Sequence, residues 1–268
     1  MGAALELLTF NQTDAPAAFA AMTANVGNSA TIRNASANSK IWLLTAWGMA
    51  TGQAVNVRVR SPLLHDNVQG IRTHIQVNNV AILLDPKFPE KMFPQDALLV
   101  EIQSITADAG TNVHGFSMLV YYEDLIGAAA NLISPDFLMA KREHTMTTEN
   151  TITTTATGAY SGEEALSAEL SQFKANTFYA IAGYTCDVTG GSVRYRGIFS
   201  SNLGVGGPAE ADDQFFTMNF FVWLSERSGK PCIPAFNSAD IAAVLIDATQ
   251  DEGGADILVT TFCHQLRP

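Results

Sequence analysis

The sequence predicts an all-β fold made of two tandem, jelly-roll-like antiparallel β-sandwiches with one or two short helices. Two observations carry this prediction. Short runs rich in Val, Ile, Thr and aromatic residues recur along the chain, and Gly, Asn, Asp and Pro separate them at roughly 8–14-residue intervals, which is typical of strands joined by turns. The sequence also echoes itself about half a chain apart, which indicates that one β module is repeated.

The echo consists of two segments that occur in the same order. Val57–Arg60, with the sequence Val-Arg-Val-Arg, returns 136 positions later as Val193–Arg196, with the sequence Val-Arg-Tyr-Arg. Ile102–Gly110 resembles Leu245–Gly253, which lies 143 positions later. A chain of 268 residues is long for one core and suits two domains of ~100–150 residues each. We therefore expect one module at residues 1–130 and a second at residues 131–268.

The first half contains one predicted helix and seven predicted strands. Asp14–Met22 is the helix, because Asp14 can cap it and Pro16 suits its first turn. Apolar and polar residues alternate most clearly in Val55–Arg60, as expected of a strand with one face in a core. The predicted strands are Ala30–Asn34, Ile41–Ala46, Ala54–Arg60, Gly70–Val77, Ala81–Leu84, Leu98–Thr106 and Gly115–Tyr122.

The second half contains a similar set of elements. Ser161 and Glu164 form a capping box, so a helix is predicted over Glu163–Phe173. The glycine-rich segment Gly204–Pro208 is predicted to be a flexible loop, and the junction between the halves is placed between Tyr122 and Thr151. The predicted strands are Thr151–Thr157, Thr177–Tyr184, Ser192–Phe199, Gln214–Leu224, Ala242–Thr249 and Ile257–Cys263.

The arginines of the repeated strands are the most suggestive polar residues. Arg58 and Arg60 share one strand face, and Arg194 and Arg196 repeat that spacing in the second half. One interpretation is bidentate pairing with carboxylates across a subunit or module interface. The other is salt bridging within each module on a solvated face. We select Arg58, Arg60, Arg194 and Arg196 as candidate interface residues.

Motifs for catalysis or metal binding do not emerge from the sequence. There is no Gly-x-Ser-x-Gly, no Walker loop, and no His-x-His pair of the kind a cupin metal site would need. The Asp-Gly segments at Asp108/Gly110 and Asp251/Gly253 suit turns better than calcium loops. Cys186, Cys232 and Cys263 fit buried apolar positions. We therefore expect no catalytic residues, no metal and no cofactor, and a protein that is not an enzyme.

Composition narrows the partners and the compartment. The formal net charge of −11 argues against broad nucleic-acid binding, because an acidic surface repels phosphates. The N-terminal residues lack the basic region of a signal peptide, and no apolar run is long enough for a transmembrane helix. Only 15% of the residues are charged, which favours a surface covered by another copy or by a partner. The expected site of synthesis is a cytoplasm.

Two tandem jelly rolls in an acidic chain without catalytic motifs resemble the double jelly-roll major capsid proteins of tailless icosahedral bacteriophages and of the adenovirus lineage. The resemblance lies in the architecture and transfers no site residues. It implies a virion structural protein, made in the host cytoplasm, whose homotrimer forms a pseudo-hexagonal capsomer and contacts other shell proteins. It also implies upright strands, with Ser61–Gly70, Asp85–Asp96 and Ser200–Asp213 as outer loops.

Other classes of protein fit parts of the pattern. An immunoglobulin-like pair is the structural competitor, although the Cys–Trp–Cys core of true family members is missing. A bicupin-like β-sandwich enzyme would need a metal. A carbohydrate-binding or tail-associated module would need Trp42, Trp47 and Trp223 exposed for stacking on sugars, whereas their apolar surroundings favour packing in the core.

Overall fold

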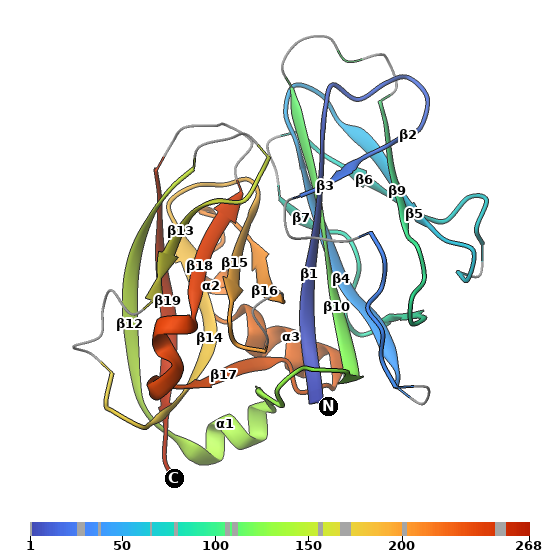
Figure 1. Cartoon of the computed structure of the whole chain (residues 1–268). Helices are drawn as coiled ribbons and strands as arrows, with labels where there is room; N and C mark the ends of the chain where they lie inside the picture. Colours follow the sequence, from blue (N-terminus) through green and yellow to red (C-terminus); the bar gives the residue numbers. More distant parts are fainter. Residues whose placement is uncertain are drawn as a thin grey trace.

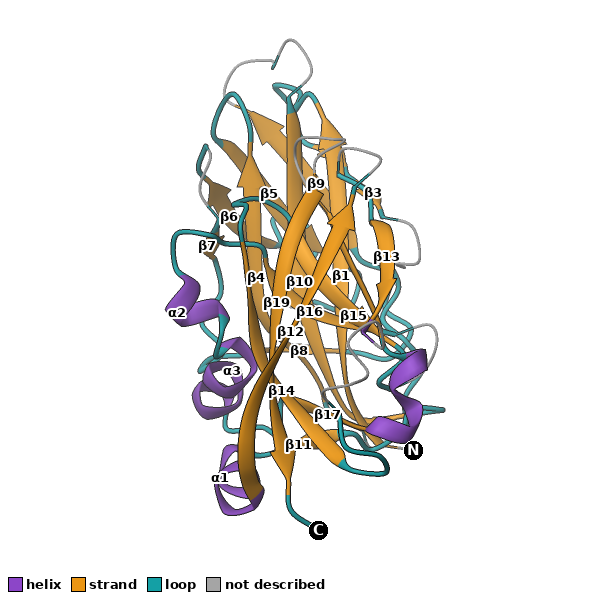
Figure 2. Cartoon of the chain, turned by 90° about the vertical axis from the view of Figure 1, so that its left-hand side faces the viewer, coloured by secondary structure: helices purple, strands orange, loops and turns teal. Residues whose placement is uncertain are grey.

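The computed structural model describes residues 2–25, 30–36, 39–64, 66–77, 80–104, 108, 112–154, 158–166, 173–199, 203–249 and 256–268. Its strands form four antiparallel sheets, which confirms the predicted all-β class. The described helices are short: α1 (Pro135–Lys141), α2 (Gln214–Thr217), α3 (Phe220–Ser228) and a 3-10 helix at Ser238–Ala243. Figure 2 shows α1, α2 and α3 along one side of the molecule. No described helix has the length and apolar character needed to cross a bilayer.

The first half builds two sheets from strands that all precede residue 126. One sheet has the order β3-β1-β10-β4-β7, with β8 also paired to β4, and the other has the order β2-β9-β5-β6. The bounds are β1 (Gly2–Thr13), β2 (Ala20–Ala21), β3 (Thr23–Ala24), β4 (Ile41–Ala50), β5 (Val55–Arg60), β6 (Ile71–Ile75), β7 (Ala81–Ile82), β8 (Glu90–Met92), β9 (Leu99–Ser104) and β10 (Val113–Leu125).

The second half also builds two sheets, from strands that all follow residue 131. Their orders are β11-β17-β14-β19-β12 and β13-β18-β15-β16. The bounds are β11 (Leu132–Ile133), β12 (Arg142–Thr153), β13 (Ser161–Ala165), β14 (Phe178–Cys186), β15 (Ser192–Arg196), β16 (Gly204–Pro208), β17 (Ile233–Asn237), β18 (Leu245–Thr249) and β19 (Asp256–Leu266).

The two halves share one strand order. We count β2 with β3 and β7 with β8 as single interrupted strands in the first half, and start the second half at β12. In each half, one sheet then contains the first, eighth, third and sixth strands, and the other contains the second, seventh, fourth and fifth. Eight strands in two facing sheets with this order are jelly-roll-like. β5 and β15, which carry the arginines, therefore hold the same place in their halves.

The halves stand side by side, and their long strands run roughly in the same direction (Figure 1). The first half presents the outer face of its β1-β10-β4 sheet to the second half, and the side chains there are buried, including Leu5, Leu7 and Trp47. Both termini lie at the same end of the molecule (Figure 1). We call the contact between the halves the seam.

The two predicted helices are wrong where the structure describes them. Asp14 adopts a positive φ of 56°, and the chain then runs into β2, whose Ala20 pairs with Ile102. Ser161–Ala165 forms β13 and pairs with β18, while residues 167–172 of the second predicted helix lie outside the described residues. In both places, pairing with a strand distant in sequence overrides a local capping signal.

Two other predictions fail in the region that follows β15. Gln214–Leu224 is helical instead of extended: the Asp213 side chain caps α2 at Phe216, and α3 buries Phe220 and Leu224 on one face. Gly204–Pro208 is the buried strand β16 and no flexible loop. A Cβ on Gly206 would lie 1.9 Å from the Val193 carbonyl oxygen, so glycine is needed there for close approach of two strands.

Some strands have no counterpart among the predictions. β1 was not predicted at all, and most of β12 lies in the segment assigned to the junction. Conversely, the predicted strand at Ala30–Asn34 contributes only an isolated bridge between Thr31 and Ala97. β1 reads as a mixed apolar run because both of its faces are buried, which removes the alternation that marks a half-exposed strand.

Candidate functional site: two arginine clusters and the seam

The first arginine cluster joins two guanidinium groups to one carboxylate. Arg58 lies opposite Glu101 in the β5–β9 ladder, and its Nε donates to Glu101 Oε2 at 2.7 Å. Arg60 donates from Nε to Oε2 at 2.6 Å and from Nη2 to Oε1 at 3.2 Å. Burial by itself would raise the pKa of Glu101, but the hydrogen bonds from Arg60 and Arg58 outweigh it and hold the pKa at about 2.

An aromatic ring completes the first cluster. The Arg58 guanidinium lies over the Phe19 ring, 4.1 Å from its centroid, and Arg72 of β6 lies 5.4 Å from the same centroid. Phe19 is half-buried and Arg72 is exposed. We call Phe19, Arg58, Arg60, Arg72 and Glu101 the exposed arginine cluster. At the surface it presents an aromatic ring with the Arg58 guanidinium on its face and Arg72 close by.

The second cluster repeats this arrangement in a buried setting. Arg194 donates to both oxygens of Asp247 on the neighbouring strand, at 2.9 and 2.7 Å, and only 5% of its surface is exposed. Arg196 forms ion pairs with Asp247 and Glu163. The Arg194 guanidinium lies 3.6 Å from the centroid of the Tyr160 ring. Burial by itself would lower the pKa of Arg194, and the bonds to Asp247 reverse this and raise it.

All four predicted arginines therefore contact carboxylates of their own half. The structure brings Arg58 together with Arg60 and Arg194 together with Arg196, but it does not join the two pairs. Their role at an interface stays a prediction. The partner carboxylates, Glu101 and Asp247, were not predicted from the sequence. The sequence echo aligns Ile102 with Leu245 and would therefore match Glu101 with Val244. The strand ladders instead match Glu101 with Asp247, which lies three residues further along the second half.

The second cluster continues into the seam through Tyr160. The Tyr160 and Thr9 hydroxyls lie 2.8 Å apart, and burial raises the pKa of Tyr160 to about 12, so its hydroxyl stays protonated. Ser117 bonds to Thr9 at 3.1 Å and to Ser192 at 2.9 Å, and Trp47 donates its indole N–H to Ser192 at 2.9 Å. A buried hydroxyl network therefore links β1, β10 and β4 to the second half.

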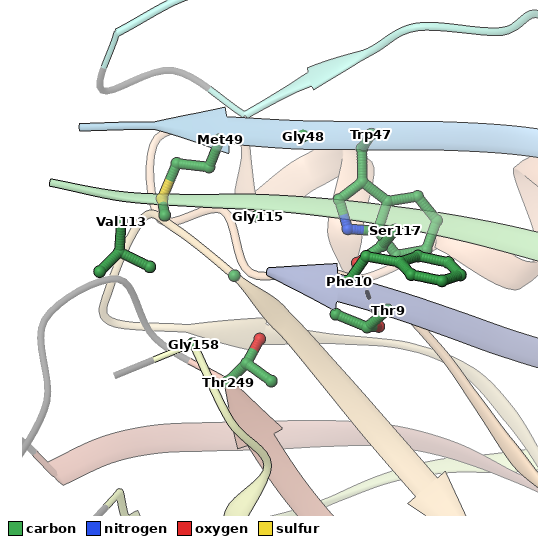
Figure 3. A pocket seen from close by; sticks show the side chains of 11 residues that line it. Thr9, Phe10, Trp47, Gly48, Met49, Val113, Gly115, Ser117, Gly158 and Thr249 are labelled. Carbon is green, nitrogen blue, oxygen red and sulfur yellow. Dashed lines mark hydrogen bonds between the residues drawn. The ribbon is translucent and has the colours of Figure 1, made fainter. Parts of the chain in front are cut away.

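The seam encloses a small pocket at one end of this network (Figure 3). Thr9, Trp47 and Ser117 line it from the first half, and Gly158 and Thr249 line it from the second. Figure 3 shows Thr9, Ser117 and Trp47 grouped on one side of the pocket, with Gly158 and Thr249 across from them. Its walls are hydroxyls, glycines and apolar carbons, which suit packing and hydrogen bonding but offer no acid–base pair.

Aromatic and charged contacts extend the seam away from the pocket. The Trp47 ring meets Phe220 of α3 edge-on, with centroids 6.0 Å apart. Lys230, which follows α3, lies 4.8 Å from the Trp42 ring and 5.6 Å from the Tyr121 ring. Arg227 of α3 pairs with Asp85 of the first half at 2.7 Å on the surface. These contacts lock the relative position of the halves through cation–π and aromatic packing.

The aromatic rings considered for sugar binding lie in this packing. Trp47 is buried, and Trp42 and Trp223 are half-buried against the core. Trp42 is also covered by Lys230. Rings that pack against a protein core and a lysine do not offer a free face for stacking on a sugar.

Reactive groups elsewhere in the described part of the chain are few. His114 is buried, with Nε2 2.7 Å from Asp108, and His264 contacts the Thr145 hydroxyl. No group of three His, Cys, Asp or Glu side chains among the described residues is placed to hold a metal ion. Burial raises the pKa of Cys186 to about 11 and of Cys232 and Cys263 to about 12, so the thiols stay protonated at neutral pH.

Some of the residues considered in the sequence analysis are not described by the structure. His65, Gly110, Asp251 and Gly253 lie outside the described residues. Asp108 accepts a hydrogen bond from Asn112, as expected of a turn, and bonds to His114.

No protein-family model matches the sequence, and no curated protein matches it. Solved structures that align along nearly the whole chain include two proteins of different origin. The PBSX exported protein XepA is 11% identical, over 97% of this chain and 86% of its own, with a TM-score of 0.27. The major capsid protein P2 from bacteriophage PM2 is 8% identical, over 99% and 98%, with a TM-score of 0.21. TM-scores this low do not establish a shared fold, so the function has to be inferred from the chain's own contacts.

Proposed function

We propose that this protein is a virion structural protein, a shell subunit that assembles as a homotrimer. In this proposal residues 1–130 and 131–268 are its two jelly-roll modules, and the residues that the structure describes form no catalytic centre in either. The observation that supports this most is the repeated strand order in two halves that stand side by side across a buried seam. The resemblance in architecture to double jelly-roll capsid proteins supplies the link to a viral shell.

The geometry of the chain suits a closed ring of modules. One half contacts the other through different surfaces: the outer face of the β1-β10-β4 sheet on one side, and Tyr160, Ser192 and α3 on the other. A head-to-tail contact of this kind can be repeated by further copies, and it produces a ring when the rotation closes. Three copies would place six similar modules around one axis, as in a pseudo-hexagonal capsomer.

The rigidity of the seam is the second support. A shell subunit has to hold its two modules in one orientation so that all copies tile alike. The halves are in contact at several positions along the strands. These contacts are the hydroxyl network, the Trp47–Phe220 ring pair and the stacking of Lys230 on Trp42. A buried polar network of this type specifies one relative arrangement of the elements it joins.

Sedimentation velocity and negative-stain electron microscopy test the proposal. The purified protein should sediment as a species of three times the 28.7 kDa chain mass, and single particles should have a roughly hexagonal outline. A monomer at concentrations relevant to assembly would count against the proposal. Elemental analysis adds a second readout, because a stoichiometric transition metal in the purified protein would favour a bicupin-like enzyme instead.

A further inference from the structure

Strands β1 and β12 occupy the same place in their halves, and their residues can be matched one to one. Thr9 is the eighth residue of β1 and pairs with Ser117, the fifth residue of β10. Glu149 is the eighth residue of β12 and pairs with Thr260, the fifth residue of β19. Glu149 therefore stands in the second half where Thr9 stands in the first.

The two equivalent faces differ in what covers them. Thr9 is 3% exposed because Tyr160 and other groups of the second half close over it. On β12, the residues of the corresponding face, Thr147, Glu149 and Thr151, are exposed. A hollow beside α2, lined by Asp187, Gln214, Leu258 and Thr260 among others, opens on the same sheet. On β12 and β19, the second half thus carries an uncovered copy of part of the face that the seam buries in the first half, while α2 and α3 pack on the neighbouring strand β14.

The groups that do the covering are duplicated as well. Tyr160 immediately precedes β13, and Phe19 immediately precedes β2, which is the corresponding strand of the first half. Arg194 stacks on Tyr160 just as the equivalent Arg58 stacks on Phe19. Both rings are half-buried, but the Tyr160 hydroxyl bonds to Thr9 across the seam, whereas Phe19 contacts Arg58 and Arg72 of its own half. The first half thus carries a second covering surface that is not used within the chain.

The two surfaces that the seam leaves unused, the outer face of β12–β19 and the exposed arginine cluster, are complementary to each other in charge. In the seam, Thr9 meets the Tyr160 hydroxyl, and Arg194 lies opposite Gly206 of β16. In the unused pair, Glu149 replaces Thr9, Phe19 replaces Tyr160, and Arg72 replaces Gly206, since Arg72 lies opposite Arg58. A hydroxyl pair is thereby exchanged for a carboxylate on one surface and, on the other, an aromatic ring with two arginines over it.

Exposed apolar side chains mark the same region of the first half. Val68 and Leu63, both in the connection between β5 and β6, are 64% and 51% exposed, and the Val68 carbonyl accepts a hydrogen bond from Arg58. In the second half, β16, which corresponds to β6, is buried and packs against β1 of the first half. Exposed apolar side chains grouped at one place favour burial against a protein partner.

From these matches we propose that the β12–β19 face of one copy binds the exposed arginine cluster of a second copy. Glu149 then lies against Phe19 between Arg58 and Arg72, and the contact repeats the geometry of the seam between chains. This inference rests on the proposed shell-subunit function and names the surface that closes its trimer. Each copy uses β12–β19 toward one neighbour and the exposed arginine cluster toward the other, so three copies satisfy all contacts in a ring.

Charge reversal tests the contact in the full-length protein. Glu149→Arg and Arg72→Glu should each raise the protein concentration at which the trimer dissociates by at least about tenfold, because each places like charges together. The double variant Glu149→Arg/Arg72→Glu restores opposite charges between positions 149 and 72 at each of the three contacts and should recover most of the trimer. Glu164→Arg makes the same charge change at an exposed position of β13 and should leave the trimer intact. Sedimentation velocity gives the assembly state, and circular dichroism confirms that each variant is folded.

The outcomes separate this inference from the proposed function. If the wild-type protein is a monomer, both fail. If the wild-type protein is a trimer and Glu149→Arg leaves it intact, the shell-subunit proposal stands and the surface named here is wrong. If both single variants dissociate but the double variant does not recover, Glu149 and Arg72 do not face each other, which also overturns the contact.

Discussion

The two arginine clusters hold the same place in the two halves of the molecule but differ in burial. In the second half, Arg194 and Asp247 are both nearly inaccessible, and Tyr160 above them is bonded to the other half. In the first half, Glu101 is buried, but Arg60 and Arg72 reach the surface, and the Phe19 ring has no hydroxyl that could bond to the other half. The difference shows how one repeated motif serves as internal structure in one place and as a candidate contact in another.

The largest expected effect comes from breaking the buried pair. Asp247→Asn should lower the free energy of unfolding by about 3–5 kcal/mol, because Arg194 keeps its charge without a buried partner. Glu101→Gln should cost less than half as much, since water can reach Arg58 and Arg60. Urea unfolding of the two variants measures both values. Equal losses would show that the clusters do not differ in burial as described.

A smaller effect separates the covered sheet face from the uncovered one. Ser117→Ala removes the hydroxyl that connects Thr9 to Ser192 and should cost about 1–2 kcal/mol of stability. Thr260→Ala changes the matched position on β19 and should stay within about 0.5 kcal/mol, because the site is half-exposed. The pair is compared by thermal or urea unfolding. A larger loss at Thr260 than at Ser117 would reverse the assignment of covered and uncovered faces.

The smallest expected effect depends on pH. The pKa of Glu101 lies at about 2 in the folded protein, against an ordinary value of 4.5, so its ion pairs stabilise the fold fully above about pH 4.5. That contribution is lost as the pH falls from about 4.5 to 2. The stability difference between the wild type and Glu101→Gln should therefore shrink over this range in urea unfolding. A difference that stays constant down to pH 2 would mean that Glu101 does not titrate with the ion pair.

Sequence patterns predicted the half-exposed strands well and the doubly buried ones poorly. β5 was predicted from the alternation of Val57 and Val59 with Arg58, because its two faces meet different surroundings. β1 shows no alternation, since the seam buries the face that would otherwise be polar. The sequence of β1 does not show that a second module covers its sheet. The missing alternation of apolar and polar residues therefore cannot be interpreted from the strand's own sequence.

The candidate site was predicted only in part, for a similar reason. The four arginines are visible from the repeated spacing, but Glu101 and Asp247 become their partners only through ladders between strands distant in sequence. Phe19 and Tyr160 occur before strands that the local capping signals had assigned to helices. The glycines of β16 likewise predict a flexible loop. In the structure they allow close strand pairing, because Gly206 packs against the Val193 carbonyl. Contacts that form over long sequence separations decided each of these cases.

Cross-linking tests the central claim most directly, because it reports the contact and the number of copies in one measurement. The Glu149→Cys/Arg72→Cys variant is treated with a short bismaleimide and analysed on a denaturing gel; the native cysteines are buried and protonated. Glu164→Cys/Arg72→Cys is the control and should remain uncross-linked. A covalent ladder that ends at three chains is the predicted result. Failure to link chains through positions 149 and 72, or a ladder that continues beyond three, would contradict the account.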